Sequence, residues 1–89
     1  MTNLEDYELI FPCEYPVKVI GRDENDFTGF VVDVVTRHVP QLTREDFRTR
    51  SSGGEKYIAV SVTFIAESRQ QVDAMYAELG KDERVKVAF

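Results

Sequence analysis

The sequence predicts a single α+β domain whose elements follow in the order strand, helix, strand, strand, helix, strand. Two observations carry this prediction. Apolar residues occupy every second position in four short segments, and they recur every three to four residues in two longer ones. At 89 residues the chain has room for one hydrophobic core and not for two. Hydrophobic residues make up 43% of it and charged residues 30%, which is typical of a soluble globular protein.

The first strand is expected over residues 15–21 and the first helix over residues 27–39. Apolar side chains lie on one side of the strand, at alternate positions. The helix carries an apolar stripe with spacings of three and four residues, and Asn25 or Asp26 is placed to cap its start. Pro40 disfavours its continuation. The stripe consists of Phe27, Phe30, Val31, Val34, Val35 and His38.

A β-hairpin is expected next. Residues 45–52 form a weaker strand candidate, and residues 57–66 form the strongest strand in the chain. Gly53-Gly54 between them is a two-residue turn signal, because a type I′ turn needs positive φ at both of its central positions.

The second helix is expected to begin after Ser68 and to end before Gly80. Ser68 and Gln71 match a capping box, in which each side chain satisfies a backbone N–H of the first turn. Gly80 is placed as a C′ glycine. The last strand is expected over residues 84–89, and its apolar side is formed by Val85, Val87 and Phe89.

Two crossovers joined by a central hairpin are the ferredoxin-like βαββαβ pattern. By analogy, the four-stranded antiparallel sheet has its strands in the order four, one, three, two, with both helices on one face. Parallel pairing of the first and third strands around the first helix is also expected. The predicted core consists of Val17, Val19, Phe30, Val31, Val34, Val35, Ile58, Val60, Val62, Phe64, Val72, Met75, Tyr76, Leu79, Val85 and Val87.

Charge divides the chain into two parts. Residues 1–14 hold four acidic residues and no basic one, and we expect them to form an acidic arm on a single domain of residues 15–89. The whole chain has 11 basic and 16 acidic residues and a formal net charge of −5, which disfavours non-specific nucleic-acid binding. The single cysteine, Cys13, excludes an intramolecular disulfide and fits a cytoplasmic location. Neither a signal peptide nor a membrane-spanning apolar run is expected.

No catalytic or metal-binding constellation emerges from the sequence. One cysteine, Cys13, and one histidine, His38, are too few for a zinc site. The acids between residues 23 and 33 do not have the spacing of a calcium loop, and they suit the positive end of a helix dipole. We therefore expect a protein that is not an enzyme and that has no metal or other cofactor.

Several short motifs follow one another over residues 10–89. They are Phe11-Pro12, KVIG at 18–21, VVTRHVP at 34–40, SS at 51–52 before Gly54, VSVT at 60–63, and Tyr76 with Leu79-Gly80-Lys81. In this order they resemble the YbeD-like family of small uncharacterised bacterial proteins. The resemblance implies a ferredoxin-like domain similar to ACT-type regulatory domains, in a family without an established activity.

The same resemblance implies a place for a ligand. ACT domains usually bind small molecules, often amino acids, near the turn from the first strand to the first helix and at dimer interfaces. On this chain the corresponding ligand-binding residues are Gly21, Arg22, Asp23 and Gly29. A homodimer is one arrangement that the resemblance allows.

A second candidate site follows from the predicted strand register. With Gly53-Gly54 as the loop, Arg48 faces Ala59 and Arg50 faces Tyr57, on the side of the sheet away from the helices. The first and last strands add three further basic residues and no acid to that side. The predicted docking surface consists of Lys18, Arg48, Arg50, Tyr57, Arg84 and Lys86.

The leading functional prediction is a regulatory or adaptor module, which acts by sensing a small ligand or by docking to a protein partner. An acidic partner of the basic surface could be a protein, an anionic ligand, or the chain's own Glu5, Asp6 and Glu8. The alternative is a nucleic-acid-binding module, which is less favoured because Tyr57 is the single aromatic residue expected there. The basic residues of the outer strands would also serve to block edge-to-edge sheet pairing, without any partner.

Overall fold

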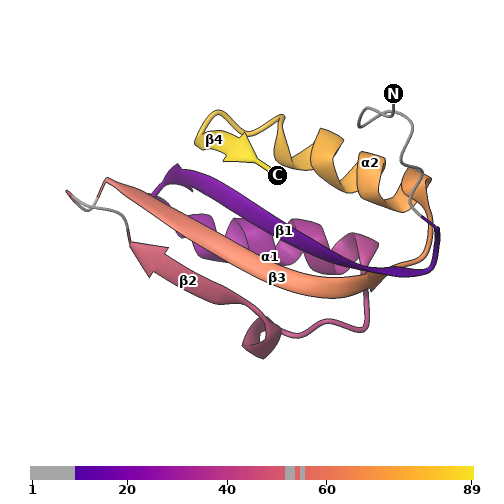
Figure 1. Cartoon of the computed structure of the whole chain (residues 1–89). Coiled ribbons are helices and arrows are strands. Elements are labelled where there is room, and N and C mark those ends of the chain that lie inside the picture. Colours follow the sequence, from indigo (N-terminus) through magenta and orange to yellow (C-terminus); the bar gives the residue numbers. More distant parts are fainter. Residues whose placement is uncertain (1–9, 52–53, 55) are drawn as a thin grey trace, which may run out of the picture.

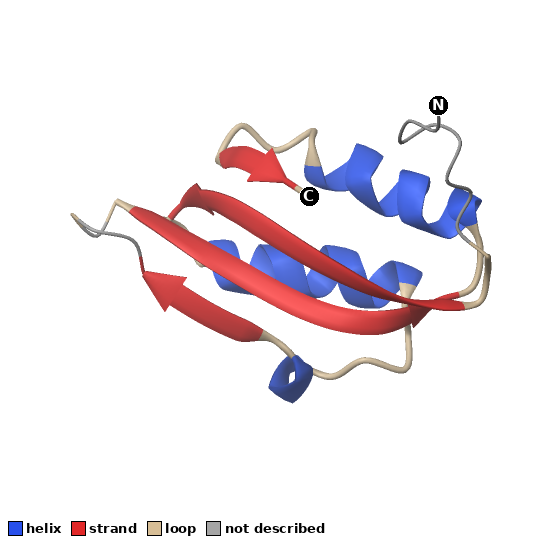
Figure 2. Ribbon diagram, in the orientation of Figure 1, coloured by secondary structure: helices blue, strands red, loops and turns tan. Residues whose placement is uncertain are grey.

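A computed structural model describes residues 10–51, 54 and 56–89. Both helices cover one face of a four-stranded antiparallel sheet (Figures 1 and 2). The strand order β2-β3-β1-β4 is the predicted order, read from the other edge, and the predicted ferredoxin-like fold is confirmed. The elements are β1 (Cys13–Arg22), α1 (Phe27–His38), η2 (Arg44–Asp46), β2 (Arg48–Ser51), β3 (Tyr57–Ala66), α2 (Arg69–Leu79) and β4 (Val85–Ala88). No helix in the described ranges is long and apolar enough to cross a membrane.

The central pair of the sheet, β1 with β3, is antiparallel. Its register runs from Cys13 opposite Ala66 to Arg22 opposite Tyr57. The two strands are neighbours as expected, but the expected parallel pairing is wrong. Because α1 is a crossover connection, β2 runs parallel to β1. The hairpin that follows reverses the chain direction, so β3 is antiparallel to both β1 and β2. Because β1 begins at Cys13, the last residues assigned to the acidic arm belong to the strand.

The outer pair, β2 with β3, is shifted by two positions from the predicted register. Arg48 lies opposite Ser61 and Arg50 lies opposite Ala59. The connection between β2 and β3 is therefore longer than the predicted two-residue turn. Of the two glycines predicted to form that turn, Gly53 lies outside the described residues, and Gly54 has a φ of 85°. Since side chains alternate along a strand, a shift of two keeps each residue on its predicted face.

A β-bulge interrupts the pairing of β4 with β1. Val87 lies opposite Ile20, whereas Val85 lies opposite Gly21, so Lys86 is the extra residue. The bulge directs Val87 away from the core, and its side chain is 42% exposed. The prediction of Val87 as a core residue is wrong, because simple alternation does not hold across a bulge.

Side-chain caps define the start of both helices. Asp26 caps α1, and its Oδ1 accepts a hydrogen bond from the backbone N–H of Gly29 at 3.1 Å. Ser68 caps α2 in the same way, with its hydroxyl accepting from the N–H of Gln71 at 3.1 Å. The Gln71 side chain reaches back one residue further than a standard capping box, to the N–H of Glu67 at 2.7 Å.

The core lies between the sheet and the two helices, and most of its predicted members are buried. Phe30, Tyr76 and Val85 are only partly buried and pack against its edge. Gly80 ends α2 as its C-cap with a φ of −70°, so it is not the left-handed C′ glycine expected from the sequence. Buried residues outside the predicted core set are Phe27, Val32, Val39, Phe47 and Ala66.

Candidate functional site

The sheet face that the helices leave uncovered, here called the open face, carries a row of side chains that runs from the residue after β4 across β1 and β3 to β2. Lys18 of β1 and Arg48 of β2 both lie opposite Ser61 of β3, one on each side of it. On the other side of Lys18, Phe89 exchanges two backbone hydrogen bonds with it, at 2.7 and 2.9 Å. The row therefore reads Phe89, Lys18, Ser61, Arg48, with a small hydroxyl residue between two cations.

Two further rows follow along the strands. In the next row, Ile20 lies between Val87 and Ala59, and Arg50 is the outermost residue. In the last row, Arg22 lies opposite Tyr57. The Lys86 ammonium lies 5.0 Å from the centroid of the Tyr57 ring, within cation–π distance.

A hollow of about 530 Å³ opens on this face around the first of these rows. The small residues Ser61 and Thr63 line it from β3, and Pro16 lines it from β1. Its lining also includes Lys18, Arg48, Asp46 and Phe89, which is 60% exposed. The hollow thus joins apolar surface to two cations.

Glu14 and Asp46, both acidic, lie on or beside the open face, which was predicted to have no acidic residue. Glu14 lies opposite Ile65, four positions along β1 from Lys18, because β1 begins earlier than expected. Asp46 lines the hollow, where its carboxylate accepts a hydrogen bond from the backbone N–H of Thr43 at 2.8 Å. Neither acid lies between the two arginines of β2.

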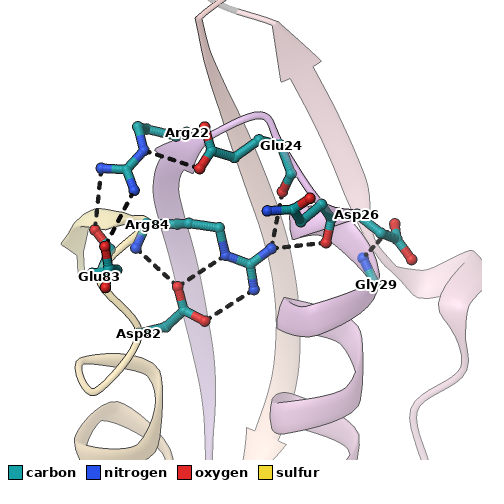
Figure 3. Close-up of polar contacts among 8 residues, drawn as sticks. Arg22, Glu24, Asp26, Gly29, Asp82, Glu83 and Arg84 are labelled. Carbon is teal, nitrogen blue, oxygen red and sulfur yellow. Dashed lines mark hydrogen bonds and ion pairs between the residues drawn. The ribbon is translucent and has the colours of Figure 1, made fainter.

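Arg84 does not lie on the open face, and its predicted placement is wrong. Its guanidinium lies over the N-terminal end of α1, 5.0 Å from the ring centroid of Phe30 and 5.5 Å from that of Phe27. It donates hydrogen bonds to the backbone carbonyls of Glu24 at 2.9 Å and Asn25 at 2.8 Å (Figure 3). Arg84 precedes β4, so the alternation used to place it does not reach that far.

Asp82 completes the arrangement around Arg84. Its carboxylate accepts from the Arg84 Nε and from a terminal guanidinium nitrogen, each at 2.9 Å (Figure 3). The hydrogen bonds from Arg84 hold the pKa of Asp82 below its ordinary value. Only 14% of the Arg84 side chain is exposed, so this cation is already occupied by the chain's own groups.

At the predicted ligand site between β1 and α1, the chain's own atoms crowd the two glycines, and a hollow of about 510 Å³ at the same turn is lined by Arg22, Glu24 and Arg84 among others. A Cβ on Gly21 would lie 2.6 Å from Phe27 Cε1, and one on Gly29 would lie 2.8 Å from Asp26 Cγ. Arg22 pairs with Glu24 at 3.4 Å, and its second acidic neighbour, Glu83, lies at 3.8 Å. The backbone N–H of Asp23 donates to the Lys56 carbonyl at 2.9 Å.

The two residues considered for nucleophilic chemistry have separate surroundings. Cys13 is half-buried in β1 opposite Ala66. The His38 Nε2 lies 2.8 Å from Glu78 Oε1, and Arg37 pairs with the same carboxylate, so these side chains join α1 to α2. Within residues 10–51, 54 and 56–89, no group of three histidine, cysteine or acidic side chains could hold a metal ion.

Three apolar residues lie on the open face without being expected there from the sequence. Phe89 and Val87 were assigned to the covered side with Val85, and Ile20 received no role. The bulge in β4 moves Phe89 and Val87 to the open face, and a bulge leaves no clear signal in a short alternating segment. The candidate site is therefore more apolar than a surface of cations with one tyrosine.

Comparison with known proteins places the chain among bacterial relatives. A family model described as "Protein of unknown function (DUF493)" matches residues 6–89. A UPF0250 protein of Chromobacterium violaceum is 38% identical over 86 residues, which cover 96% of this chain and 97% of that protein. A UPF0250 protein of Azotobacter vinelandii is 35% identical over 89 residues, with 99% and 97% covered. The resemblance described from the sequence motifs is confirmed.

Two solved structures share the fold. Protein HP0495 from H. pylori superimposes with a TM-score of 0.69 at 13% identity, over 98% of this chain and 91% of that one. The C-terminal domain of the MgtC protein from Mycobacterium tuberculosis gives a TM-score of 0.64 at 18% identity, with 85% and 82% covered. At these identities the likeness concerns the fold alone.

Proposed function

Because the chain belongs to the family described as proteins of unknown function, DUF493, we propose its function from its own geometry: a non-enzymatic adaptor whose open face docks an acidic segment of a partner protein. The observation that carries the proposal is the row in which Lys18 and Arg48 flank Ser61. Arg50 and Lys86 extend the basic surface along the sheet. On the proposal, these four cations are the partner-binding residues, together with Tyr57.

Charge selects the kind of partner. The chain has a formal net charge of −5, yet four of its 11 basic residues, Lys18, Arg48, Arg50 and Lys86, lie on one uncovered face. Two copies stacked through this face would bring like charges together, so it does not favour face-to-face self-association. Each exposed ion pair contributes only about 0–1 kcal/mol, so an acidic partner must engage several cations at once, and its affinity must fall with salt.

Ligand sensing at the turn between β1 and α1 receives less support. Gly21 and Gly29 face atoms of the chain itself, and Arg84 is bound to Asp82 and to two backbone carbonyls. A small anion would have to displace these contacts before it could bind. Docking through the open face leaves these contacts in place, and there the contact that a partner carboxylate would compete with is the hydrogen bond from Arg48 to the Glu45 backbone carbonyl, at 3.1 Å.

Nucleic-acid binding is the second candidate, because the open face holds two aromatic residues rather than one. Tyr57 lies in the row of Arg22 and Phe89 in the row of Lys18, so four positions of β1 separate them. That spacing corresponds to about 13 Å along the strand, so the two rings do not form one continuous stacking platform. The net negative charge also opposes a polyphosphate backbone.

Binding of two labelled probes, followed by fluorescence anisotropy, tests the proposal. The probes are an octaglutamate peptide and a single-stranded oligothymidylate. We expect the peptide to bind and its affinity to fall about tenfold in the double variant Arg48→Glu/Arg50→Glu, because two attractive contacts become repulsive. The matched control, Arg69→Glu/Lys81→Glu, changes the net charge equally at exposed positions in and just after α2.

The outcomes separate the candidates. Equal losses in both double variants would mean that net charge and not the open face governs binding. Tighter binding of the oligonucleotide than of the peptide would indicate that the partner is a nucleic acid and not an acidic protein segment. Binding of neither probe at low salt would overturn the proposal.

A further inference from the structure

The hollow on the open face combines apolar walls with cations on two sides. Phe89 and Arg48 line it from the two ends of the row that crosses the sheet, and Pro16 and Thr63 belong to its lining as well. Its volume of about 530 Å³ falls within the range of pockets that hold ligands, roughly 300–1,000 Å³. Contact with charges alone would leave this apolar surface exposed to water.

We propose that the hollow is the anchor pocket for one bulky apolar side chain of an extended acidic peptide segment. This inference rests on the proposed function and adds a requirement to it. The partner must present an apolar residue with carboxylates on both sides, and not acidic residues alone.

The spacing of the cations supports this requirement. Lys18 and Arg48 lie two strand spacings apart across Ser61, which corresponds to about 10 Å. In an extended peptide that crosses the strands, residues one or two positions from the anchor on each side are about 7–13 Å apart. Carboxylates at those positions therefore come within reach of the two long basic side chains when the anchor lies over Ser61.

The pattern of exposure favours the same occupant. Phe89 is 60% exposed, Val87 42% and Ile65 49%, and all three belong to the open face. Apolar surface beside exposed basic side chains is typical of a protein-docking site, in which an apolar centre is surrounded by polar contacts. A small carboxylate would use the cations and leave most of the apolar wall uncovered.

Two peptides of equal charge distinguish the contribution of the apolar anchor residue to binding affinity from that of the carboxylates. Both are labelled acidic octapeptides, one with a single central leucine among glutamates and one with serine in its place. We expect the leucine peptide to bind the wild-type chain about tenfold more tightly, because burial of much of a leucine side chain favours binding. The variant Ser61→Leu, which fills the hollow from β3, removes this preference and leaves the weak binding of the serine peptide.

The matched control is Ala59→Leu. Ala59 lies on the same strand and face as Ser61 and is likewise half-buried, but it belongs to the next row and does not line the hollow. This variant should keep the leucine preference. Amide chemical shifts of Lys18, Ser61 and Thr63 in the wild-type chain give a second measurement, which does not depend on the folding of any variant.

Different results would overturn the anchor pocket and the proposed function. Equal affinities for the two peptides, or a leucine preference that survives Ser61→Leu, would overturn the anchor pocket and leave charge-driven docking intact. Binding of neither peptide would overturn both. Acetate or N-acetylleucine that binds as tightly as the leucine peptide would identify a small-carboxylate site and would also overturn the inference.

Discussion

The Phe27 ring occupies the space into which a side chain at Gly21 would project. A Cβ at position 21 would lie 2.6 Å from Phe27 Cε1 and 2.7 Å from the backbone oxygen of Arg84. Phe27 is fully buried, and Arg84 is bound to the turn that begins α1. The absence of a side chain at Gly21 thus lets α1 and the segment before β4 pack closely on β1, whether or not a ligand binds nearby.

The substitution Gly21→Ala should lower the free energy of unfolding by about 2 kcal/mol, because neither the core ring nor the backbone carbonyl can move away easily. The control is Gly80→Ala, where the nearest atom to an added Cβ is at 3.4 Å and φ is −70°. It should change stability by less than about 1 kcal/mol. Urea denaturation of both variants measures the difference, and equal effects would contradict the packing role of Gly21.

The geometry of Arg84 should matter more than its charge. The variant Arg84→Lys keeps a cation but cannot reach Asp82 and the two carbonyls together, so we expect a loss of about 1–2 kcal/mol in unfolding free energy. Arg22→Lys is the control, because the Arg22 side chain is 42% exposed and its ion pairs are longer. Thermal denaturation should show a lower melting temperature for the Arg84 variant only.

Because of the bulge in β4, a polar substitution should destabilise the fold at Val85 but not at Val87. Val85→Thr places a hydroxyl against the core edge and should cost about 1 kcal/mol, whereas Val87→Thr should be nearly neutral on the open face. The two substitutions are chemically identical and lie in the same strand. A larger loss at Val87 than at Val85, measured by chemical denaturation, would mean that the strand register around the bulge is wrong.

Stability below neutral pH should depend on Glu78. Hydrogen bonding to His38 and, to a smaller extent, the charge of Arg37 hold the pKa of the Glu78 carboxyl below its ordinary value of 4.5. A lowered pKa in the folded state means that the carboxylate stabilises the fold above pH 4.5. This contribution disappears as the pH falls through the lower folded-state pKa.

The variant Glu78→Gln should therefore be less stable than the wild type near pH 6, and the two stabilities should converge as the pH falls below 4.5. Denaturant titrations at several pH values measure the gap between them. Glu67→Gln, at an exposed glutamate before α2, serves as the control. A gap that stays constant from pH 6 to pH 3 would show that Glu78 acts through packing and not through its charge.

The parts of the fold that the sequence predicts well are those with local causes. The alternation of residues 57–66, the cap at Ser68 and the stripe of α1 each depend on neighbours within a few positions, and the structure confirms all three. The strand order follows from their succession, since a crossover followed by a hairpin leaves few alternatives.

The errors arise where position depends on a turn or a loop. The hairpin is longer than its glycine pair suggests, which shifts the register by two, and the bulge in β4 reverses the side on which Val87 lies. Arg84 lies one residue before β4, so the alternation of that strand does not predict the direction of its side chain. For the same reason, the hollow and its Phe89 wall could not be found from the sequence, because they require the strands to be aligned first.

The central pairing of β1 with β3 also determines when the sheet can form. Its partners are separated by 35 to 53 positions, and no adjacent hairpin joins them. During synthesis, β1 therefore leaves the ribosome before either of its neighbouring strands exists, and the backbone N–H and C=O groups along its two edges have no strand partner for that time. Closing so long a loop is entropically costly, so this small domain should fold more slowly than a helical bundle of equal length.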